Sequence, residues 1–220
     1  QNSAAILNLD CDYELARAGL ILYGMSGGTI PGRELDLKPV MSIRSTVAMV
    51  KTVEPGEPVS YSRTYTTSAP TRVATVPIGY ADGFWRHNSP AGVRLTVRGQ
   101  QAPILGRVCM DQLMIDVTHV PQAEMGDYVT VFGAAPAMTA DDIAAANNTI
   151  GYEVVCGVGE RVPRLYVEDG NLVGNMASQG TTPRRLTDLI GSLCDLTSGS
   201  GDKGTPIIYI QGYFDNYTTD

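Results

Sequence analysis

The 220-residue sequence predicts a mainly β protein, in which an antiparallel β domain follows two buried strands of the kind found in parallel sheets. Three observations predict this class. Apolar and polar residues alternate over 40–53 and again in VRLTVRG (93–99), as in strands with one buried face. Other β-type runs are bounded by Gly, Pro or Asn. Two continuous apolar runs near the start are instead typical of strands buried on both faces.

The first region contains these two apolar runs, SAAILNL (3–9) and AGLILYG (18–24). We interpret them as two buried strands separated by a short turn or helix. A Gly and Pro cluster without periodicity follows at 27–39. We therefore place a domain boundary there, which separates the two apolar runs from the rest of the chain.

The second unit, residues 37–167, has the patterns of an antiparallel β domain. After the alternating segment 40–53, further strands are expected at 58–66, 71–77, 93–98, 102–117 and 127–132. The 93–98 strand has the clearest alternation. Its inward side chains are expected to be Val93, Leu95 and Val97, and its outward side chains Arg94, Thr96 and Arg98.

Two short helices are expected near the end of this unit. Thr139 is a suitable N-cap, with Asp142 three residues later and an Ala-rich turn after it. A second helix is expected near Tyr152. Residues 168–220 begin as a polar, glycine-rich linker, and a short amphipathic helix is expected over 186–196 because leucines recur there at helical spacing. The last stretch has no clear period, and no structure is assigned to it.

The composition excludes several classes of function. Sixteen Lys and Arg against 23 Asp and Glu give a net charge of −7 without a basic stripe, whereas nucleic-acid surfaces need clustered positive charge. No run of about 18 apolar residues predicts a membrane-spanning helix. The first residues lack a starting Met and the features of a secretory signal, which we read as an internal start.

The four cysteines do not have metal-site spacing. Cys11, Cys109, Cys156 and Cys194 are far apart in the chain. The two histidines add no ligand pair, so no zinc site is expected. Disulfides remain an alternative, but buried thiols in a reducing cytoplasm are the interpretation we favour.

The segment TVPIGYADGFW (75–85) places Tyr80 in a glycine-bracketed turn directly after a β run. Loop residues held by a rigid strand commonly bind ligands or take part in catalysis. From the residues alone, the alternative is a packing tyrosine at a strand end with a solvated hydroxyl.

Seven collinear motifs give the chain a specific resemblance. They are ARAGLILYG (16–24), LKPVMSIRS (37–45), VSYSRTYT (59–66), ATVPIGYADGF (74–84), APILGRVCMDQLMIDVT (102–118), GDYVTVFG (126–133) and TIGYEVVCGVGERVPRLYV (149–167). Together they resemble the bacterial alanine racemases over about residues 1–167.

This resemblance implies a pyridoxal 5'-phosphate (PLP) isomerase with an N-terminal α/β (TIM-type) barrel and a C-terminal β domain. It implies a cytoplasmic homodimer with shared active sites that interconverts L- and D-alanine for peptidoglycan, the cell-wall polymer. Residues 1–36 then correspond to the last barrel strands and 37–167 to the whole C-terminal domain. Residues 168–220 have no counterpart.

The cofactor lysine has no counterpart in the chain. In the family, PLP forms a Schiff base with a lysine on the first barrel strand. The lysines here are Lys38, Lys51 and Lys203, and none matches that position. Two alternatives to an alanine racemase therefore stay open: a non-catalytic fragment or dimerisation module, and a racemase of serine or of a broader range of amino acids.

The resemblance assigns catalytic and cofactor-facing roles to two residues. Racemisation needs an acid/base group on each face of the substrate. Tyr80 matches the family's second base, which is contributed to the opposite subunit's site. Arg17 matches the arginine that faces the pyridine nitrogen of the cofactor, a partner that keeps its own proton. The alternative for Arg17 is an ion pair with Asp10 or Glu14.

The phosphate-binding residues of the family correspond to Ser3, Gly19, Leu20 and Tyr152. Hydroxyls and backbone N–H groups suit a phosphate dianion, and glycine allows a close approach. Ala18 replaces the proline that is usual in the family. Tyr152 also favours alanine as substrate, because serine-preferring relatives commonly carry a smaller polar residue there.

The substrate carboxylate is met in the family by a loop that corresponds to Cys109, Met110 and Asp111. Arg107 of the same motif is expected nearby, as a source of positive charge for the phenol of Tyr80 and for the substrate. The alternative for this segment is the interior of a β-strand.

Overall fold

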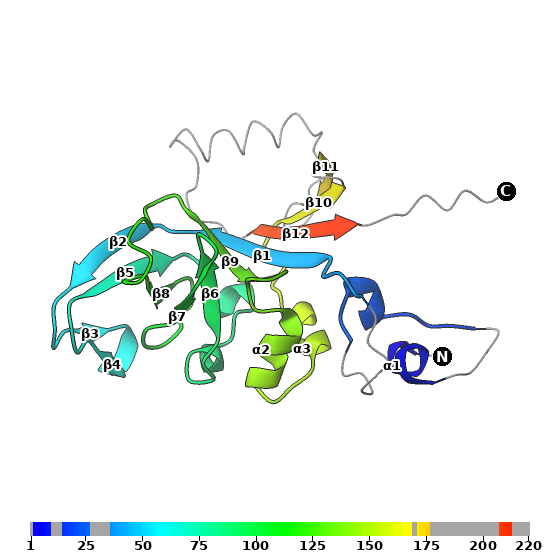
Figure 1. The fold of residues 1–220 in the computed structure, drawn as a ribbon, viewed down its shortest axis with the longest axis horizontal. Helices are drawn as coiled ribbons and strands as arrows, with labels where there is room; N and C mark the ends of the chain where they lie inside the picture. The colour runs from blue at the N-terminus through cyan, green and yellow to red at the C-terminus, as the bar shows by residue number, and fades with distance from the viewer. Residues whose placement is uncertain (1, 10–14, 27–35, 169–170, 177–206, 213–220) are drawn as a thin grey trace.

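The computed structural model describes residues 2–9, 15–26, 36–168, 171–176 and 207–212. Within these residues, short helices pack beside three β-sheets, most of whose strand pairs are antiparallel. The mainly β class expected from the sequence is confirmed. Figure 1 shows the N-terminal segment at one end of the β region, with α2 and α3 between them.

The largest sheet has seven strands. In spatial order these are β11 (Asn171–Met176), β10 (Arg164–Glu168), β12 (Ile207–Gly212), β1 (Met41–Thr46), β9 (Tyr128–Phe132), β6 (Arg94–Val97) and β7 (Gln100–Pro103). Only β10 and β12 pair in parallel among these described strands.

The two smaller sheets lie at the other end of the β region, on the left in Figure 1. One sheet has the order β2 (Met49–Val53), β5 (Thr71–Val76) and β8 (Leu113–Asp116), and the other pairs β3 (Pro58–Val59) with β4 (Tyr65–Thr66). One core joins the seven-stranded and three-stranded sheets, because Leu95 of β6, Ile115 of β8 and Val131 of β9 are fully buried in the same cluster. Burial of such side chains is the main stabilising contribution to a domain of this size.

The expected alternation in the 93–98 strand is confirmed at five of its six positions. Val93, Leu95 and Val97 are buried, and Arg94 and Arg98 are exposed. The sixth position was wrong: Thr96 is 5% exposed, not outward in solvent. The reason is that β6 lies inside the sheet, where the cross-strand neighbours Thr130 and Gln101 flank it on that face.

Three expected strands are each divided in the structure. The segment 40–53 forms β1 and β2, which belong to different sheets. The chain changes its hydrogen-bonding partner between them, because the N–H of Val47 donates to the carbonyl of Asp127 and that of Ala48 to the carbonyl of Thr75. The segment 58–66 is the β3–β4 hairpin with a 3-10 turn at Tyr61–Arg63. The segment 102–117 contains a loop between β7 and β8.

The expectation of two buried strands at the N-terminus was wrong. The first run forms helix α1 (Ser3–Asn8), and the second a 3-10 helix, η1 (Leu20–Tyr23). Asn2 caps α1, since its Oδ1 accepts the N–H of Ala5 at 2.9 Å. A short apolar run suits either a helix or a strand, and here the N-cap favours the helix. The two segments still meet through one parallel bridge between Asn2 and Arg17.

The two helices expected after the strands are confirmed. Helix α2 (Ala140–Ala146) begins with the capping box of Thr139 and Asp142, and α3 (Gly151–Cys156) follows. None of the helices among the described residues is long and apolar enough to cross a membrane.

The region after residue 168 contains more regular structure than the sequence suggested. Strand β11 forms where a polar linker was expected, and β12 forms in the last stretch. The amphipathic helix expected over 186–196 lies outside the described residues.

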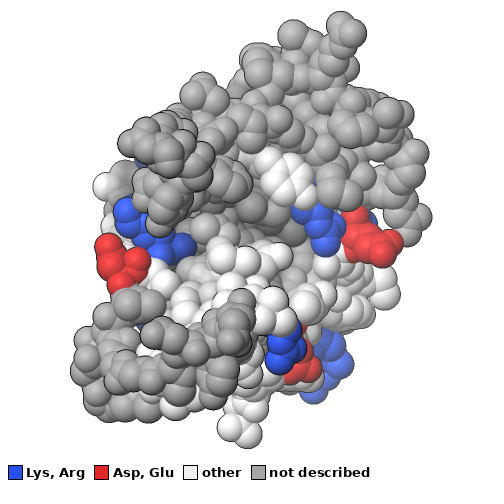
Figure 2. All heavy atoms as spheres, turned by 90° about the vertical axis from the view of Figure 1, so that its right-hand side faces the viewer, with Lys and Arg blue, Asp and Glu red and all other residues white. Residues whose placement is uncertain are grey.

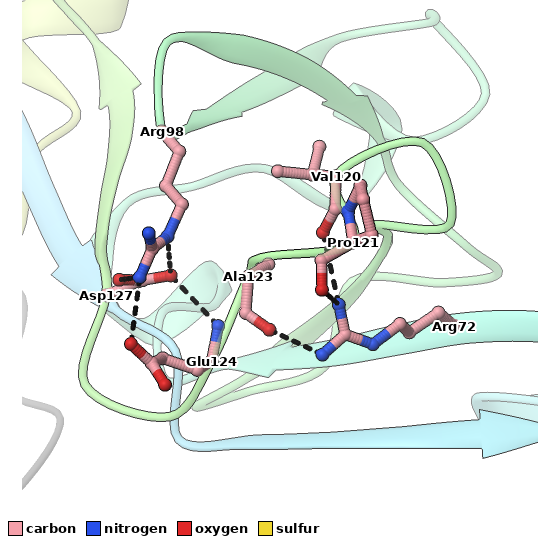
Figure 3. A network of polar contacts seen from close by, with 7 residues as sticks. All are labelled: Arg72, Arg98, Val120, Pro121, Ala123, Glu124 and Asp127. Atoms are coloured by element: carbon pink, nitrogen blue, oxygen red, sulfur yellow. Dashed lines mark hydrogen bonds and ion pairs between the residues drawn. The ribbon is translucent and has the colours of Figure 1, made fainter.

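Two arginines fasten the loop between β8 and β9 (Figure 3). Arg98 pairs with Glu124 at 2.9 Å and with Asp127 at 2.6 Å. Arg72 donates to the carbonyl oxygens of Val120, Pro121 and Ala123. Guanidinium groups suit this task because they carry five donors in a planar fork.

Candidate active site

A first cluster of polar groups joins the N-terminal segment to α3. Ser3 Oγ accepts the backbone N–H of Gly19 at 2.9 Å and that of Ile21 at 3.4 Å. Tyr152 Oη accepts the N–H of Leu20 at 3.0 Å. Two hydroxyls and three backbone N–H groups therefore converge from three segments that are distant in sequence. The four residues expected to bind a phosphate lie together.

This donor set fits a phosphate group. Each hydroxyl that accepts a backbone N–H keeps its own O–H for donation, and a phosphate dianion accepts such bonds well. Glycine at position 19 also keeps the space beside the two hydroxyls open. A Cβ there would lie 3.0 Å from Tyr152 Oη and 3.6 Å from Ser3 Oγ. Any side chain at position 19 would therefore point into the cluster.

A second cluster surrounds Tyr80. Tyr80 begins a 3-10 turn (Tyr80–Asp82) and is 41% exposed. Its backbone N–H donates to Cys109 O, and the next N–H, of Ala81, donates to Met110 O, both at 3.0 Å. A Cβ on Gly79 would overlap these same carbonyl oxygens. The Tyr80 turn therefore lies directly against the 109–111 loop.

Asp82 and Arg161 hold this turn from the side. Asp82 is 3% exposed, and its Oδ2 accepts the N–H of Gly79 at 2.8 Å. Arg161 Nε donates to Asp82 Oδ1, and its NH2 donates to Asp111 Oδ1, both at 2.7 Å. The hydrogen bond with Asp82, and after it the bond with Asp111, raise the pKa of Arg161 above its ordinary value.

Sequence reasoning did not identify Asp82 or Arg161. The signal for Asp82 was its position three residues after Gly79, as in a capped turn. No local signal marks its partner, because Arg161 follows 79 residues later.

Helix α3 connects the two clusters. Tyr152 stands in its first turn, at the phosphate-type cluster. Beyond its C-terminal end, Gly159 N–H donates to the carbonyl of Asp82 at 2.9 Å. A helix of six residues is about 9 Å long, and it is the element that contacts both clusters within one chain.

The other expected site residues lie as follows. Met110 is 53% exposed, Asp111 is exposed and Cys109 is buried. Arg107 is exposed, and its carbonyl accepts from Ser60 Oγ at 2.6 Å. Arg17 is exposed and is joined by the parallel bridge to Asn2, the residue before Ser3.

Figure 2 shows the face that contains the right-hand side of Figure 1. Among its described residues, Lys and Arg side chains alternate with Asp and Glu in small groups around uncharged residues.

The described residues also contain no group of three His, Cys, Asp or Glu side chains suited to a metal ion.

Comparison with known proteins identifies the family. The family described as "Alanine racemase, C-terminal domain" matches residues 40–166, more than half of the chain. The chain belongs to the alanine racemase family.

Individual alanine racemases match over a longer segment. The alanine racemase of Desulfovibrio desulfuricans is 52% identical over 168 residues, which are 76% of this chain and 45% of that protein. That of Clostridium tetani is 42% identical over 177 residues, 79% of this chain and 46% of that protein. The chain therefore spans less than half the length of the alanine racemases it matches.

Solved alanine racemase structures have the same fold. The Clostridium difficile 630 alanine racemase in complex with cycloserine superposes with a TM-score of 0.75 at 39% identity, covering 81% of this chain and 48% of that chain. The Bacillus anthracis alanine racemase with bound L-Ala-P gives 0.73 at 34% identity, covering 80% and 46%. In this alanine racemase family member, the Tyr80 cluster and Tyr152 lie within the family match at residues 40–166, whereas Ser3 and Gly19 precede it.

Proposed function

We propose that this chain is the C-terminal part of a PLP-dependent alanine racemase, which interconverts L- and D-alanine with Tyr80 as one of two bases. The observation that carries the proposal is the convergence of Ser3, the 19–21 N–H groups and Tyr152, in which Leu20 and Tyr152 are 132 residues apart in sequence. Membership of the family supports the reaction. We further propose that residues 1–36 end a barrel and that 37–167 form the C-terminal domain.

The proposed role of the first cluster is to hold the phosphate of PLP. The hydroxyls of Ser3 and Tyr152, which accept the N–H groups of Gly19 and Leu20, would donate their own protons to the phosphate. Bound PLP supplies the electron sink that makes the substrate's α proton removable. Arg17, beside Asn2, would hold the pyridine nitrogen in this proposal and would leave it unprotonated, because a guanidinium does not release its proton.

The proposed role of Tyr80 is proton transfer at the substrate's α carbon. Tyr80 is exposed, and it stands on a turn whose backbone N–H groups bond to the 109–111 loop. Cys109, Met110 and Asp111, with Arg107, are proposed to border the substrate carboxylate. An exposed phenol suits a site completed by another subunit, so we propose a homodimer with shared sites.

A chimaera tests this function. The part of the D. desulfuricans racemase that precedes its matched segment is joined to this chain, which is 52% identical to the segment replaced. We expect racemisation of alanine in both directions, and slower racemisation of serine because Tyr152 is retained. Tyr80→Phe should lower the rate by about a hundredfold or more. Tyr61→Phe, at another exposed tyrosine, is the control and should leave it unchanged.

A second candidate function, a non-catalytic dimerisation module, is favoured for the chain alone by the positions of its described lysines. Lys38 and Lys51 lie before β1 and on β2, in neither of the two clusters. The absorption spectrum of the purified chain mixed with PLP decides between the two. A visible band that survives gel filtration contradicts the module, and a colourless protein supports it.

The setting of this enzyme is proposed to be the cytoplasm, for use of D-alanine in the cell wall. The two described cysteines support a reducing setting, since Cys109 is buried and Cys156 exposed and both are free thiols. Fusion of the protein to a fluorescent reporter, followed by fractionation of the cells, tests the location.

A further inference from the structure

One charged group near Tyr80 is not used by the proposed reaction. Asp82 is a carboxylate that is almost completely buried, two residues after the proposed base. A buried carboxylate is costly unless it is paired and hydrogen-bonded. Here it has both kinds of partner, the N–H of Gly79 and the guanidinium of Arg161. The turn that carries Tyr80 is therefore held by an ion pair whose carboxylate is buried and whose guanidinium is part exposed.

The same guanidinium reaches a second segment. Arg161 Nε lies 2.7 Å from Asp82 Oδ1, and Arg161 NH2 lies 2.7 Å from Asp111 Oδ1. Asp82 belongs to the Tyr80 turn, and Asp111 to the 109–111 loop. These two segments also share the backbone bonds from Tyr80 and Ala81. One arginine thus closes a ring of polar contacts around the junction of the two segments.

We propose that Arg161 is a positioning residue for Tyr80, because it joins Asp82 to Asp111 and so fixes the Tyr80 turn against the 109–111 loop. The proposal rests on the proposed function for the statement that Tyr80 is a base. The contacts of Arg161 at the junction do not depend on the proposed function. Arg161 itself is not a catalytic residue, since its described contacts are with the two carboxylates.

The proposal has a physical reason in the reaction. A base must lie within hydrogen-bond reach of the proton that it removes. Displacement of a reacting group by about 1 Å costs as much as a hundredfold in rate. Tyr80 is on a short turn with an exposed side chain, so its position depends on what holds the turn. A planar fork can bond two carboxylates at once, which a lysine ammonium on a flexible stem does less well.

Arg98 is a matched control in the same chain. It too bridges two carboxylates, Glu124 and Asp127, and its side chain is 40% exposed against 48% for Arg161. Its partners lie in the loop before β9 (Figure 3), away from the Tyr80 turn in sequence and in hydrogen bonding. Arg98→Lys therefore changes the same chemistry without changing the junction at Tyr80.

The first experiment measures amide hydrogen exchange in the 220-residue chain. Arg161→Lys should accelerate exchange at Tyr80 and Ala81 by about tenfold or more, while β6 and β9 keep their protection. Arg98→Lys should leave the exchange rates of the Tyr80 and Ala81 amides unchanged. Asp111→Asn is a second variant, which removes only the 62% exposed partner and leaves the pair with Asp82. It should give a smaller acceleration at the same two amides.

The second experiment measures the reaction in the chimaera. Arg161→Lys should lower kcat by about tenfold to a hundredfold, with KM changed by less than about threefold. The primary isotope effect of α-deuterated alanine should rise in the one direction in which Tyr80 removes the proton. A merely structural loss of folded protein lowers kcat but leaves both isotope effects unmoved. Arg98→Lys should leave kcat, KM and both isotope effects as they are.

The outcomes separate the two proposals. Unchanged exchange at Tyr80 and Ala81 in Arg161→Lys overturns the positioning role, whatever the chimaera does. Isotope effects that stay equal to those of the parent chimaera overturn it as well. A parent chimaera that binds PLP but does not racemise alanine contradicts the proposed function instead, and the exchange experiment still decides whether Arg161 fixes the turn.

Discussion

The hydroxyl oxygen of Tyr152 accepts a hydrogen bond from the backbone N–H of Leu20 at 3.0 Å, across 132 residues of sequence. Because Tyr152 stands on α3, this bond ties the N-terminal segment to the β domain. The same hydroxyl lies in the cluster proposed to bind phosphate. One side chain therefore contributes both to the assembly of the chain and to its proposed cofactor site.

Tyr152→Phe should weaken PLP binding by the chimaera by about tenfold, since a hydrogen bond to a charged group contributes about 1.5–3 kcal/mol. The dissociation constant, from titration of the apo form with PLP, measures this. Tyr128→Phe, on the exposed side of β9, is the control. Equal affinities of the two variants would contradict a role of the Tyr152 hydroxyl at the phosphate.

Thr96→Val should stabilise the chain by about 1 kcal/mol. The buried Oγ1 of Thr96 has no hydrogen-bond partner among the described residues, and valine has nearly the same shape without the hydroxyl. Thr71 provides the contrast, because its equally buried hydroxyl donates to Ala69 O at 2.8 Å. Thr71→Val should therefore destabilise by about 1 kcal/mol. Urea unfolding of both variants checks the opposite signs.

These examples show where sequence patterns sufficed and where they did not. The buried positions of β6 and the capping box of α2 follow from local periodicity and local hydrogen bonds, and both were predictable. The burial of Thr96 depends on its neighbours in the sheet, which local alternation does not specify. The division of 40–53 into β1 and β2 depends on bonds to Asp127 and Thr75.

The candidate site was likewise predictable from the sequence only in part. Tyr80 and Tyr152 stand in recognisable motifs, so a family resemblance was enough to select them. The pair of Asp82 and Arg161 is a tertiary contact between two segments, and neither residue has a local feature that names its partner. The N-terminal runs were wrongly predicted for another reason: apolar runs of about seven residues suit helices and strands equally, and the helix depends on the cap that Asn2 provides.

The stability of the loop between β8 and β9 should depend on pH through Asp127. Partial burial acts to raise the pKa of this carboxyl, but the hydrogen bonds from Arg98 and from Glu124 N–H, with the arginine's charge, lower it overall. A lowered pKa means that the contribution to stability is present above the unfolded pKa of about 4 and is lost as pH falls through the folded value.

The difference in free energy of unfolding between the parent chain and Asp127→Asn measures this contribution. It should be constant from neutral pH to about pH 5 and shrink toward zero as the pH falls below about 4. Glu124→Gln, which removes the more exposed partner of Arg98, should change stability little over the same range. A difference that grows on acidification would contradict the assigned sign.

Gly83→Ala should lower the free energy of unfolding much more than Gly56→Ala, although both glycines have positive φ, +96° and +87°. An alanine at either position pays about 1–2 kcal/mol for that conformation. At Gly83 the new Cβ would also overlap the carbonyl of Gly157 after α3, whereas nothing lies within 4 Å at Gly56. The overlap should add about 1–3 kcal/mol, because backbone atoms on both sides must move. Urea unfolding of the two variants gives the difference, and hydrogen exchange at Tyr80 locates it. Equal losses of stability would mean that α3 and the Tyr80 turn are not in the close contact that the structure gives them.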